Sequence, residues 1–284
     1  MNGEKRGMND VGLNSVGLDN VGLDDAGLDG SALSKGHLAV VGIGPGDLDR
    51  CTLQAQEVLT QATLLYGYGA YLERLTRLPH QCFVVSDNRV EAQRASAALA
   101  QAAAGHRVAM VSGGDPGVFA MAAAICEQIE QGPQAWRALN VLIVPGVTAM
   151  LAVAAECGAP LGHDFCAISL SDNLKPWTSV LKRLEAAAAG DFVIALYNPR
   201  SKARPWQLEA AFNHLRQRLS EDTVVVFGRA AARAETRQWV TTLGQASAGG
   251  VDMATLVIIG AQATRVVPRR GHTPLVYTPR HGMP

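Results

Sequence analysis

The pattern that most constrains the fold is an alternation of short apolar runs with longer helix-like stretches, beginning at His37. Many of the apolar runs are unbroken stretches of Val, Ile and Leu, as in strands whose sheet is covered on both faces. The pattern therefore predicts an α/β protein. We expect strands over 38–43, 62–66, 82–85, 107–111, 140–144, 165–169, 191–197, 223–227 and 254–260. We expect helices over 50–61, 88–104, 116–131, 147–157, 176–188, 205–219 and a short piece near 233–236.

The chain divides into a leader and two blocks. Residues 1–36 are rich in glycine and mildly acidic, and they contain a five-residue repeat that begins Val-Gly-Leu or Ala-Gly-Leu, followed by Asp or Asn. One coil of a repeat structure has no neighbours against which to bury its faces, so we interpret this leader as disordered and assign it no function. The turn Pro145–Thr148 ends the first block. We therefore predict an N-terminal α/β domain over 37–146 and a C-terminal α/β domain over 147–284.

Composition excludes several classes of protein. The formal net charge is zero and aromatic residues make up 5% of the chain, which argues against a nucleic-acid binder. No apolar run approaches the roughly 18 residues of a membrane span. The N-terminus has no signal-peptide core. The five cysteines are scattered and without metal-ligand spacing, as expected for buried free thiols in a reducing cytosol. We expect a cytoplasmic protein without a membrane, nucleic-acid or metal partner.

Two glycine-rich turns indicate where a ligand binds. The segments Gly42–Asp47 and Ser112–Phe119 each follow an apolar run and precede a helix-like stretch. Open α/β sheets bind ligands at such loops, beyond the carboxyl ends of their strands. The first turn is not a dinucleotide fingerprint, because Asp47 stands in place of the third glycine. The next strand also runs into Gly67 without the acidic residue that binds a ribose. The site therefore binds a nucleotide-like ligand in another way.

The absence of an acid–base array suits one ligand in particular. S-adenosylmethionine carries an activated methyl group, and its departing thioether needs no acid, so catalysis is chiefly positioning and desolvation. Main-chain groups and small residues can provide such a site. The sequence offers no defensible Ser/His/Asp array, and its seven histidines have no partners at metal-ligand spacing.

Three motifs in order resemble those of the tetrapyrrole (corrin and porphyrin) methylase family. They are Gly42–Asp47, Ser112–Gly117 and Pro145–Ala149, and the resemblance spans about 37–279. Further segments are similar to the branch that methylates C17 of precorrin-3B. These segments are Leu65–Tyr71, Ser86–Arg89, Ser169–Trp177, Ala195–Lys202 and Arg204–Leu208.

The resemblance implies an activity, a cofactor and a set of contacts. The implied activity is S-adenosylmethionine-dependent methyl transfer to C17 of precorrin-3B or its cobalt analogue, with ring contraction, in cobalamin biosynthesis. Family members are usually homodimers of two-domain α/β subunits with the cofactor in the cleft between domains. Asp115 is suited to accept a hydrogen bond from a ribose or amino group of the cofactor. The alternative interpretation is that Asp115 is an ordinary turn residue. The implied cofactor contacts are Pro45, Gly113, Gly114, Asp115, Val118, Thr148, Ala149, Leu196 or its neighbour Tyr197, and Gly228.

A tetrapyrrole edged with acetate and propionate groups needs a local cluster of cations. The alternative is that charged loops are simply solvated faces. Three aromatic residues, Tyr68, Tyr71 and Trp177, are candidates to pack on the macrocycle or within the core. The candidate cations are Arg89, Arg200, Lys202, Arg204 and Arg229, with Arg233 and Arg237 beyond them.

Ring contraction also requires a proton to move, and the sequence does not single out the group. Asp47, Asp87 and Asp172 are candidate acid–base residues, although Asp47 is equally suited to cap a helix. The alternative functions are methylation at C11 or C20, an RNA or protein methylase, and a nicotinamide-dependent oxidoreductase. Whether the substrate carries cobalt is also left open.

Overall fold

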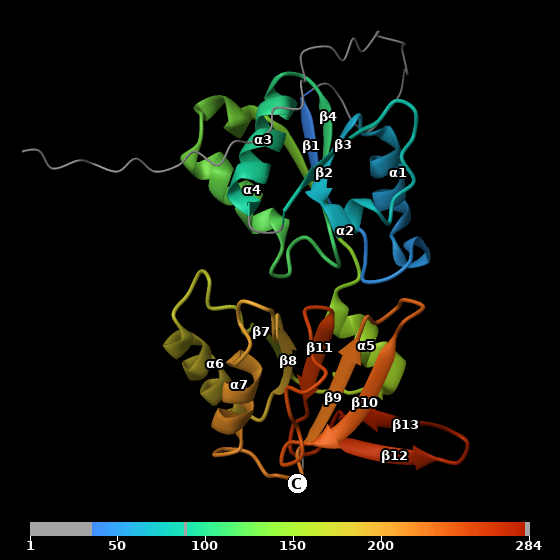
Figure 1. Cartoon of the computed structure of the whole chain (residues 1–284), viewed down its shortest axis with the longest axis vertical. Coiled ribbons are helices and arrows are strands. Elements are labelled where there is room, and N and C mark those ends of the chain that lie inside the picture. The colour runs from blue at the N-terminus through green and yellow to red at the C-terminus, as the bar shows by residue number, and fades with distance from the viewer. Residues whose placement is uncertain (1–35, 88–89, 282–284) are drawn as a thin grey trace, which may run out of the picture. The chain divides into compact units, whose positions relative to one another are not determined.

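Parallel strands form the first sheet, as the unbroken apolar runs predict (Figure 1). The computed structural model describes residues 36–87 and 90–281. All strand pairs of this sheet are parallel, and their order is β3-β2-β4-β1-β5. Its strands are β1 (His37–Gly42), β2 (Leu64–Tyr68), β3 (Cys82–Ser86), β4 (Arg107–Ser112) and β5 (Asn140–Val144).

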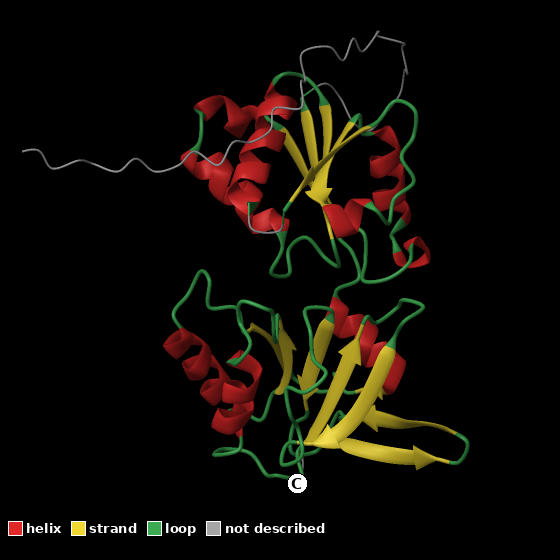
Figure 2. Ribbon diagram, viewed as in Figure 1, coloured by secondary structure: helices red, strands yellow, loops and turns green. Residues whose placement is uncertain are grey.

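Helices cover both faces of this sheet (Figure 2). Because side chains alternate along a strand, Leu38 and Val40 of β1 pack on one face and Ala39 and Val41 on the other. The helix α1 starts where the Thr52 hydroxyl accepts a hydrogen bond from the Ala55 amide at 3.1 Å. The helical segments are η1 (Leu48–Arg50), α1 (Leu53–Gln61), α2 (Gly69–Leu72), α3 (Glu91–Ala103), α4 (Met121–Gln131) and η2 (Gln134–Ala138).

The second sheet is mixed. Its order is β10-β9-β11-β8-β7, in which only the β7–β8 pair is parallel. A smaller sheet has the order β12-β13-β6. The strands of these two sheets are β6 (Gly158–Ala159), β7 (Phe165–Ser169), β8 (Val193–Tyr197), β9 (Val224–Arg229), β10 (Arg237–Thr242), β11 (Thr255–Ile259), β12 (Arg265–Arg269) and β13 (His272–Tyr277).

Three helices bury the two faces of the mixed sheet. One face packs on α6 and α7, in a core that includes Leu184, Phe212 and Phe227. The other face packs on α5, through Val153 and its neighbours. These helices are α5 (Ala149–Cys157), α6 (Trp177–Ala189) and α7 (Gln207–Leu215).

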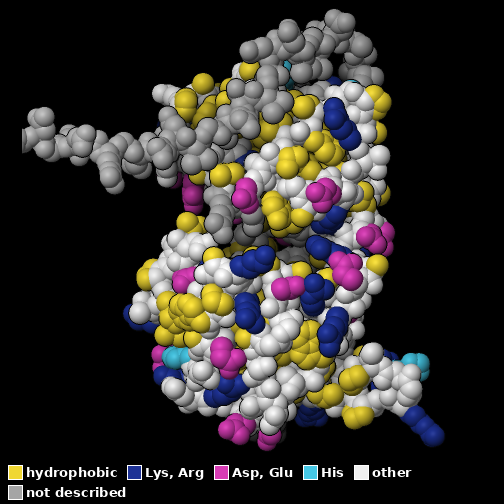
Figure 3. Space-filling model, in the orientation of Figure 1, with side chains coloured by type: hydrophobic (Ala, Val, Ile, Leu, Met, Phe, Trp, Pro, Cys, Tyr) yellow, Lys and Arg dark blue, Asp and Glu magenta, His cyan; other side chains and the backbone are white. Residues whose placement is uncertain are grey.

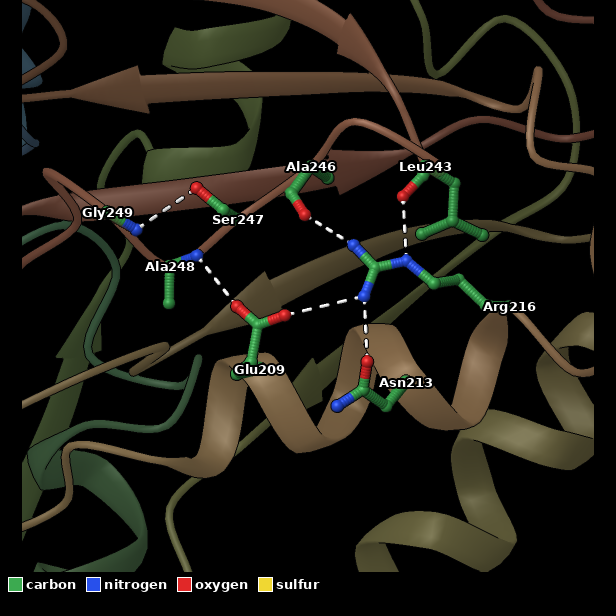
Figure 4. Close-up of polar contacts among 8 residues, drawn as sticks. All are labelled: Glu209, Asn213, Arg216, Leu243, Ala246, Ser247, Ala248 and Gly249. Carbon is green, nitrogen blue, oxygen red and sulfur yellow. Dashed lines mark hydrogen bonds and ion pairs between the residues drawn. The ribbon is translucent and has the colours of Figure 1, made fainter.

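A polar network fastens the segment after β10 to α7 (Figure 4). Arg216 donates from Nε to the Leu243 carbonyl at 3.1 Å and from Nη2 to the Ala246 carbonyl. Glu209 accepts from the Ala248 amide at 3.0 Å and from Arg216 at 3.4 Å. Glu209 of α7 and Arg216, which directly follows this helix, thus hold the chain that leads to residues 251–254.

The nine predicted strands are all present, and the predicted fold class is confirmed. The helix predicted near 233–236 is wrong, because hydrogen-bonded turns occupy this segment. The sequence did not predict the short helices α2 and η2 or the strands β6, β10, β12 and β13. The strand β6 has two residues, β10 carries polar residues, and β12 and β13 also carry a proline each, so none of them has a long continuous apolar run. Residues 1–35 of the proposed leader lie outside the described residues. The described residues belong to one compact unit, and the division at 146/147 stays a prediction.

Candidate functional site

The two glycine turns are joined through their main chains. The amide of Gly44 donates to the Gly114 carbonyl at 3.2 Å, and the amide of Gly114 donates to the Gly44 carbonyl at 3.0 Å. Both residues have positive φ, at 69° and 67°, a conformation that glycine adopts without strain. The turns after β1 and β4 therefore form one unit.

Asp115 joins the second glycine turn to the third motif. Its Oδ1 accepts from the Gly117 amide at 2.8 Å, and its Oδ2 accepts from the Gly146 amide at 3.0 Å. The turn interpretation of this residue is thus correct as far as the Gly117 contact goes. The Gly146 contact adds a second role, since it connects the loop after β4 to the loop after β5.

Two arginines bind the carbonyl groups of the first turn. Arg74, which follows α2, donates to the carbonyls of Ile43 at 3.0 Å, Gly44 at 3.1 Å and Gly46. Arg233 donates from Nε to the Pro45 carbonyl at 3.1 Å. Four consecutive carbonyl groups therefore face guanidinium groups, an arrangement unlike the amide-lined turn of a dinucleotide site.

The start of α5 is bound by a tyrosine from β8. The Tyr197 hydroxyl lies 2.6 Å from Thr148 Oγ1 and accepts from the Met150 amide at 3.1 Å. Burial raises the pKa of Tyr197, so its phenol is neutral at physiological pH. Phe119 packs on the same tyrosine, with ring centroids 5.2 Å apart, although Phe119 is 50% exposed and has a φ of 53°. Thr148 makes no capping bond of its own, because Tyr197 takes that role.

A cavity of about 200 Å³ lies where these elements meet. Loops that follow strands of both large sheets contribute to its wall. Its apolar wall includes Val153 and Leu256, and its polar wall includes Asn198 and Arg233. Nine predicted cofactor contacts line it: Pro45, Gly113, Gly114, Asp115, Val118, Thr148, Ala149, Tyr197 and Gly228.

The family follows from comparison with known proteins. A profile described as "Tetrapyrrole (Corrin/Porphyrin) Methylases" matches residues 37–247. The chain belongs to the tetrapyrrole methylase family. The predicted family is therefore confirmed, and the matched segment contains both glycine turns and Asp115.

Relatives of this tetrapyrrole methylase identify its branch. A protein from Sinorhizobium sp named "Precorrin-3B C(17)-methyltransferase" is 59% identical over 245 residues, covering 86% of this chain and 96% of that one. A "Probable cobalt-factor III C(17)-methyltransferase" from Salmonella typhimurium is 40% identical over 242 residues, covering 85% and 99%. The crystal structure of the methyltransferase CobJ matches with a TM-score of 0.80 and 46% identity, covering 85% and 99%. These matches confirm the predicted branch, and the chain is a methyltransferase.

One predicted cofactor contact lies apart from the cavity of this methylase. Leu196 is fully buried in the core with α6 and α7 and does not line the cavity. Since neighbours on a strand point to opposite faces, Tyr197 faces the cavity where Leu196 cannot. Of the alternatives Leu196 and Tyr197, the geometry favours the tyrosine. That the nine lining residues contact a cofactor stays a prediction.

The predicted substrate cations do not form one free cluster. Arg200 and Lys202 line a second cavity of about 610 Å³, which shares Met253 and Ala254 with the first. Arg204 is 8% exposed, and its guanidinium donates to the Asn198 carbonyl at 3.2 Å. The Arg204 guanidinium therefore stabilises its own loop.

Two of the remaining predicted cations also contact other side chains of the protein. Arg229 forms an ion pair with Asp252 at 2.9 Å, and Arg237 lies over the Trp239 ring at 5.7 Å. Arg89 lies outside the described residues. On the face drawn in Figure 3, Lys and Arg side chains gather across the middle with Asp and Glu among them. Positive charge there is interspersed with negative charge.

The three candidate acid–base residues are not brought together at the first cavity, and none of them lines it. Asp47 is exposed at the start of η1, and its side chain makes no capping bond. Asp172 accepts from Gln207 Nε2 at 3.1 Å. The Asp87 carbonyl accepts from Arg94 Nη2. The capping alternative for Asp47 is wrong, since Thr52 caps α1.

The aromatic candidates have different surroundings. Tyr71 lines the first cavity, where its ring lies against Gly113 so closely that no side chain fits there. Tyr68 packs edge-on against Tyr71 at 5.5 Å, and Trp177 against Trp206 at 5.0 Å. Only Tyr71 of the three candidates contributes to that cavity.

Sequence reasoning missed Arg74 and Met253, which both line the first cavity. Arg74 lies in an ordinary polar stretch, Glu73-Arg74, and no local pattern marks it. Its role depends on the first turn, some thirty residues earlier in the chain. Met253 is one apolar residue in a loop, and its place between two cavities depends on the packing of that loop.

Two absences hold within the described part of the chain. No cluster of His, Cys, Asp or Glu there is suited to hold a metal ion. No helix there is both long and apolar enough for a membrane span.

The five cysteines are free thiols. Cys51 and Cys157 are buried and Cys126 is exposed, so the prediction of buried thiols is correct for two of them.

Proposed function

We propose that this chain transfers the methyl group of S-adenosylmethionine to C17 of precorrin-3B, with ring contraction, in cobalamin biosynthesis. The observation that carries the proposal is the 59% identity to a precorrin-3B C(17)-methyltransferase over nearly its whole length. The identity to a cobalt-factor III methyltransferase is lower, at 40%. This difference favours the cobalt-free precursor.

The first cavity fits such a cofactor by its chemistry. A Cβ at Gly114 would lie 3.8 Å from Thr148 Cα and make only ordinary van der Waals contacts, and Gly114 itself lines the cavity. Thr148 offers a hydroxyl, Asp115 a carboxylate and Phe119 an aromatic ring. An adenosine with an amino-acid tail needs this mixture of polar and apolar groups. We assign the cofactor to the nine lining residues named above.

When bound, the cofactor supplies a sulfonium methyl group that passes to carbon as the S–C bond breaks and its electron pair stays on sulfur. The chain's own residues then have to orient the donor and exclude water. The Phe119–Tyr197 contact and the Tyr197–Thr148 hydrogen bond hold three parts of the wall in fixed positions. Thr148 is 6% exposed, so this part of the site is largely shielded from solvent.

The second cavity suits the acceptor. It is about three times larger than the first, has Arg200 and Lys202 in its wall, and adjoins the first at Met253 and Ala254. An acceptor held there by its carboxylates would reach the donor past the Met253 side chain. We further propose a homodimer, as the family resemblance implies, and a cytoplasmic location, as the scattered free cysteines suggest.

The test is a reaction of the purified protein with methyl-labelled S-adenosylmethionine and precorrin-3B, in parallel with the cobalt-containing analogue. Mass spectrometry should show one added methyl group, and carbon NMR should place it at C17. A label at C11 or C20, or faster turnover of the cobalt analogue, would contradict the proposal.

A further inference from the structure

Two guanidinium groups share the wall of the first cavity without a matching carboxylate. Arg74 and Arg233 both line this cavity, and both bind carbonyls of the turn Ile43–Gly46. Among the described residues, no carboxylate lies within ion-pair distance of Arg74. The carboxylate nearest to Arg233 belongs to Glu235, which is 3.9 Å away and exposed.

The electrostatics of this pair are incomplete. Burial and the neighbouring Arg233 both lower the pKa of Arg74, so the two cations act on each other. Asp47 also acts on Arg74, but this side chain is exposed and reaches neither guanidinium as an ion pair. Partly buried cations are normally paired with an anion, whereas here carbonyl dipoles face Arg74 and the exposed Glu235 is the only described carboxylate within ion-pair distance of Arg233.

Donors remain available for a ligand. The bonds to the turn use Nη1 and Nη2 of Arg74 and Nε of Arg233. Within the described residues, Arg74 Nε and Arg233 Nη2 have no hydrogen-bond partner. The Tyr71 phenol lies beside them; burial raises its pKa, and the two arginines offset part of this rise. Arg forms its strongest contacts with planar, two-oxygen anions.

We propose that Arg74 and Arg233 form a carboxylate-binding site in the wall of the first cavity. This inference rests on the proposed function, because two carboxylates of that reaction are candidates. One belongs to the amino-acid tail of the cofactor and the other to an acetate or propionate arm of the tetrapyrrole.

The experiment uses Arg233→Met in the full chain, because Arg74 still holds the turn in this variant. The matched control is Arg218→Met, which removes an arginine that pairs with Glu185 and does not line the cavity. Calorimetry compares adenosylhomocysteine with 5′-methylthioadenosine, which lacks the amino-acid carboxylate. An absorbance titration measures uroporphyrin III, a stable tetrapyrrole with acetate and propionate arms.

A cofactor carboxylate at the site predicts that adenosylhomocysteine loses about tenfold in affinity, roughly 1.4 kcal/mol, while methylthioadenosine is unchanged. A substrate carboxylate predicts that uroporphyrin III loses about tenfold while both adenosine ligands are unchanged. Either result supports the site and identifies its ligand. A merely structural role would weaken both adenosine ligands equally.

Equal losses for the two adenosine ligands, or changes below about twofold for all three probes, would overturn the inference. Arg74→Lys, which keeps the charge but loses the planar fork, should show a smaller loss in the same arm. The binding measurements need no turnover. A wild-type protein that binds both ligand classes yet fails to methylate precorrin-3B would therefore contradict the proposed function and not this site.

Discussion

The sequence predicts ligand binding both by the glycine turns of the N-terminal half and by the basic loops of the C-terminal half, and the structure arranges these two regions differently. The turns converge on one cavity through Gly44, Gly114 and Asp115. The basic loops do not converge in the same way. Arg204 is buried within its own loop and Arg229 is paired with Asp252, whereas Lys202 borders a cavity.

The difference shows which kinds of site residue a local sequence pattern can predict. A glycine in a turn after a strand often marks a close approach of the main chain to a ligand, and the strand order of a parallel sheet brings such turns together. An arginine has many possible partners, and its partner is chosen by tertiary packing. Charge alone therefore predicts a ligand contact poorly.

Replacing a glycine of the convergent turns should have the largest effect. A Cβ at Gly42 would lie 2.6 Å from the Gly114 carbonyl oxygen and 2.9 Å from the Gly146 amide nitrogen. Both contacts are with main chain that cannot move aside, so Gly42→Ala should lower the free energy of unfolding by about 3 kcal/mol.

Urea unfolding measures this change, and Gly249→Ala is the matched control. Its added Cβ would lie 3.4 Å from Ser247 Oγ, an ordinary contact, so its cost should stay within about 0.5 kcal/mol. Equal stabilities for the two variants would mean that the turns are not closely packed on one another.

Much of the fold could be predicted because its signals are periodic. Strands such as β1 and β4 are continuous apolar runs, and each is central in a covered sheet. The hairpin β12–β13 has mostly exposed residues and a proline in each strand, so it lacks that signal. The antiparallel pairs of the second sheet could not be foreseen either, because strand direction depends on connections rather than on composition.

The site was predictable in its main-chain part and not in its side-chain part. Asp115 was expected to face a ligand, and its proline and glycine neighbours did mark a turn, yet its bond to Gly146 depends on a loop 31 residues away. Arg74 had no local signal at all. Such residues acquire their roles only when the three loops are packed together.

Within the basic loops, buried and bordering cations should respond oppositely. Arg204→Met removes the donor to the Asn198 carbonyl and should cost about 2 kcal/mol of unfolding free energy. Lys202→Met should leave stability within about 0.5 kcal/mol and weaken uroporphyrin III binding instead. Urea unfolding and the absorbance titration separate the two effects. A stability loss at Lys202, or none at Arg204, would reverse the assignment of these two residues.

Asp115 tests whether a turn residue in the convergent region serves the fold or the ligand. Asp115→Asn keeps one oxygen acceptor, so either the Gly117 or the Gly146 amide loses its partner. We expect unfolding free energy to fall by about 1 kcal/mol and adenosylhomocysteine to bind more weakly by calorimetry. A drop in affinity at unchanged stability would mean that the carboxylate acts on the ligand alone.

His37 extends the comparison into the first sheet with the smallest expected effect. It begins β1, is 2% exposed, and neither ring nitrogen has a hydrogen-bond partner among the described residues. Burial lowers the pKa of His37 below its ordinary 6.5, so below that pH the unfolded chain binds more protons than the folded one. The contribution of His37 to the free energy of unfolding is fully present above about pH 6.5 and declines as the pH falls toward the folded-state pKa, by at most about 1.4 kcal/mol per pH unit.

Urea unfolding between pH 7.5 and 5.5 should show a shallower decline for His37→Leu than for the wild type. His272→Asn, at an exposed position, should keep the wild-type slope. If His37→Leu kept that slope too, the ring would be accessible to protons in the folded state, and this end of β1 would be less tightly packed than the turn it leads to.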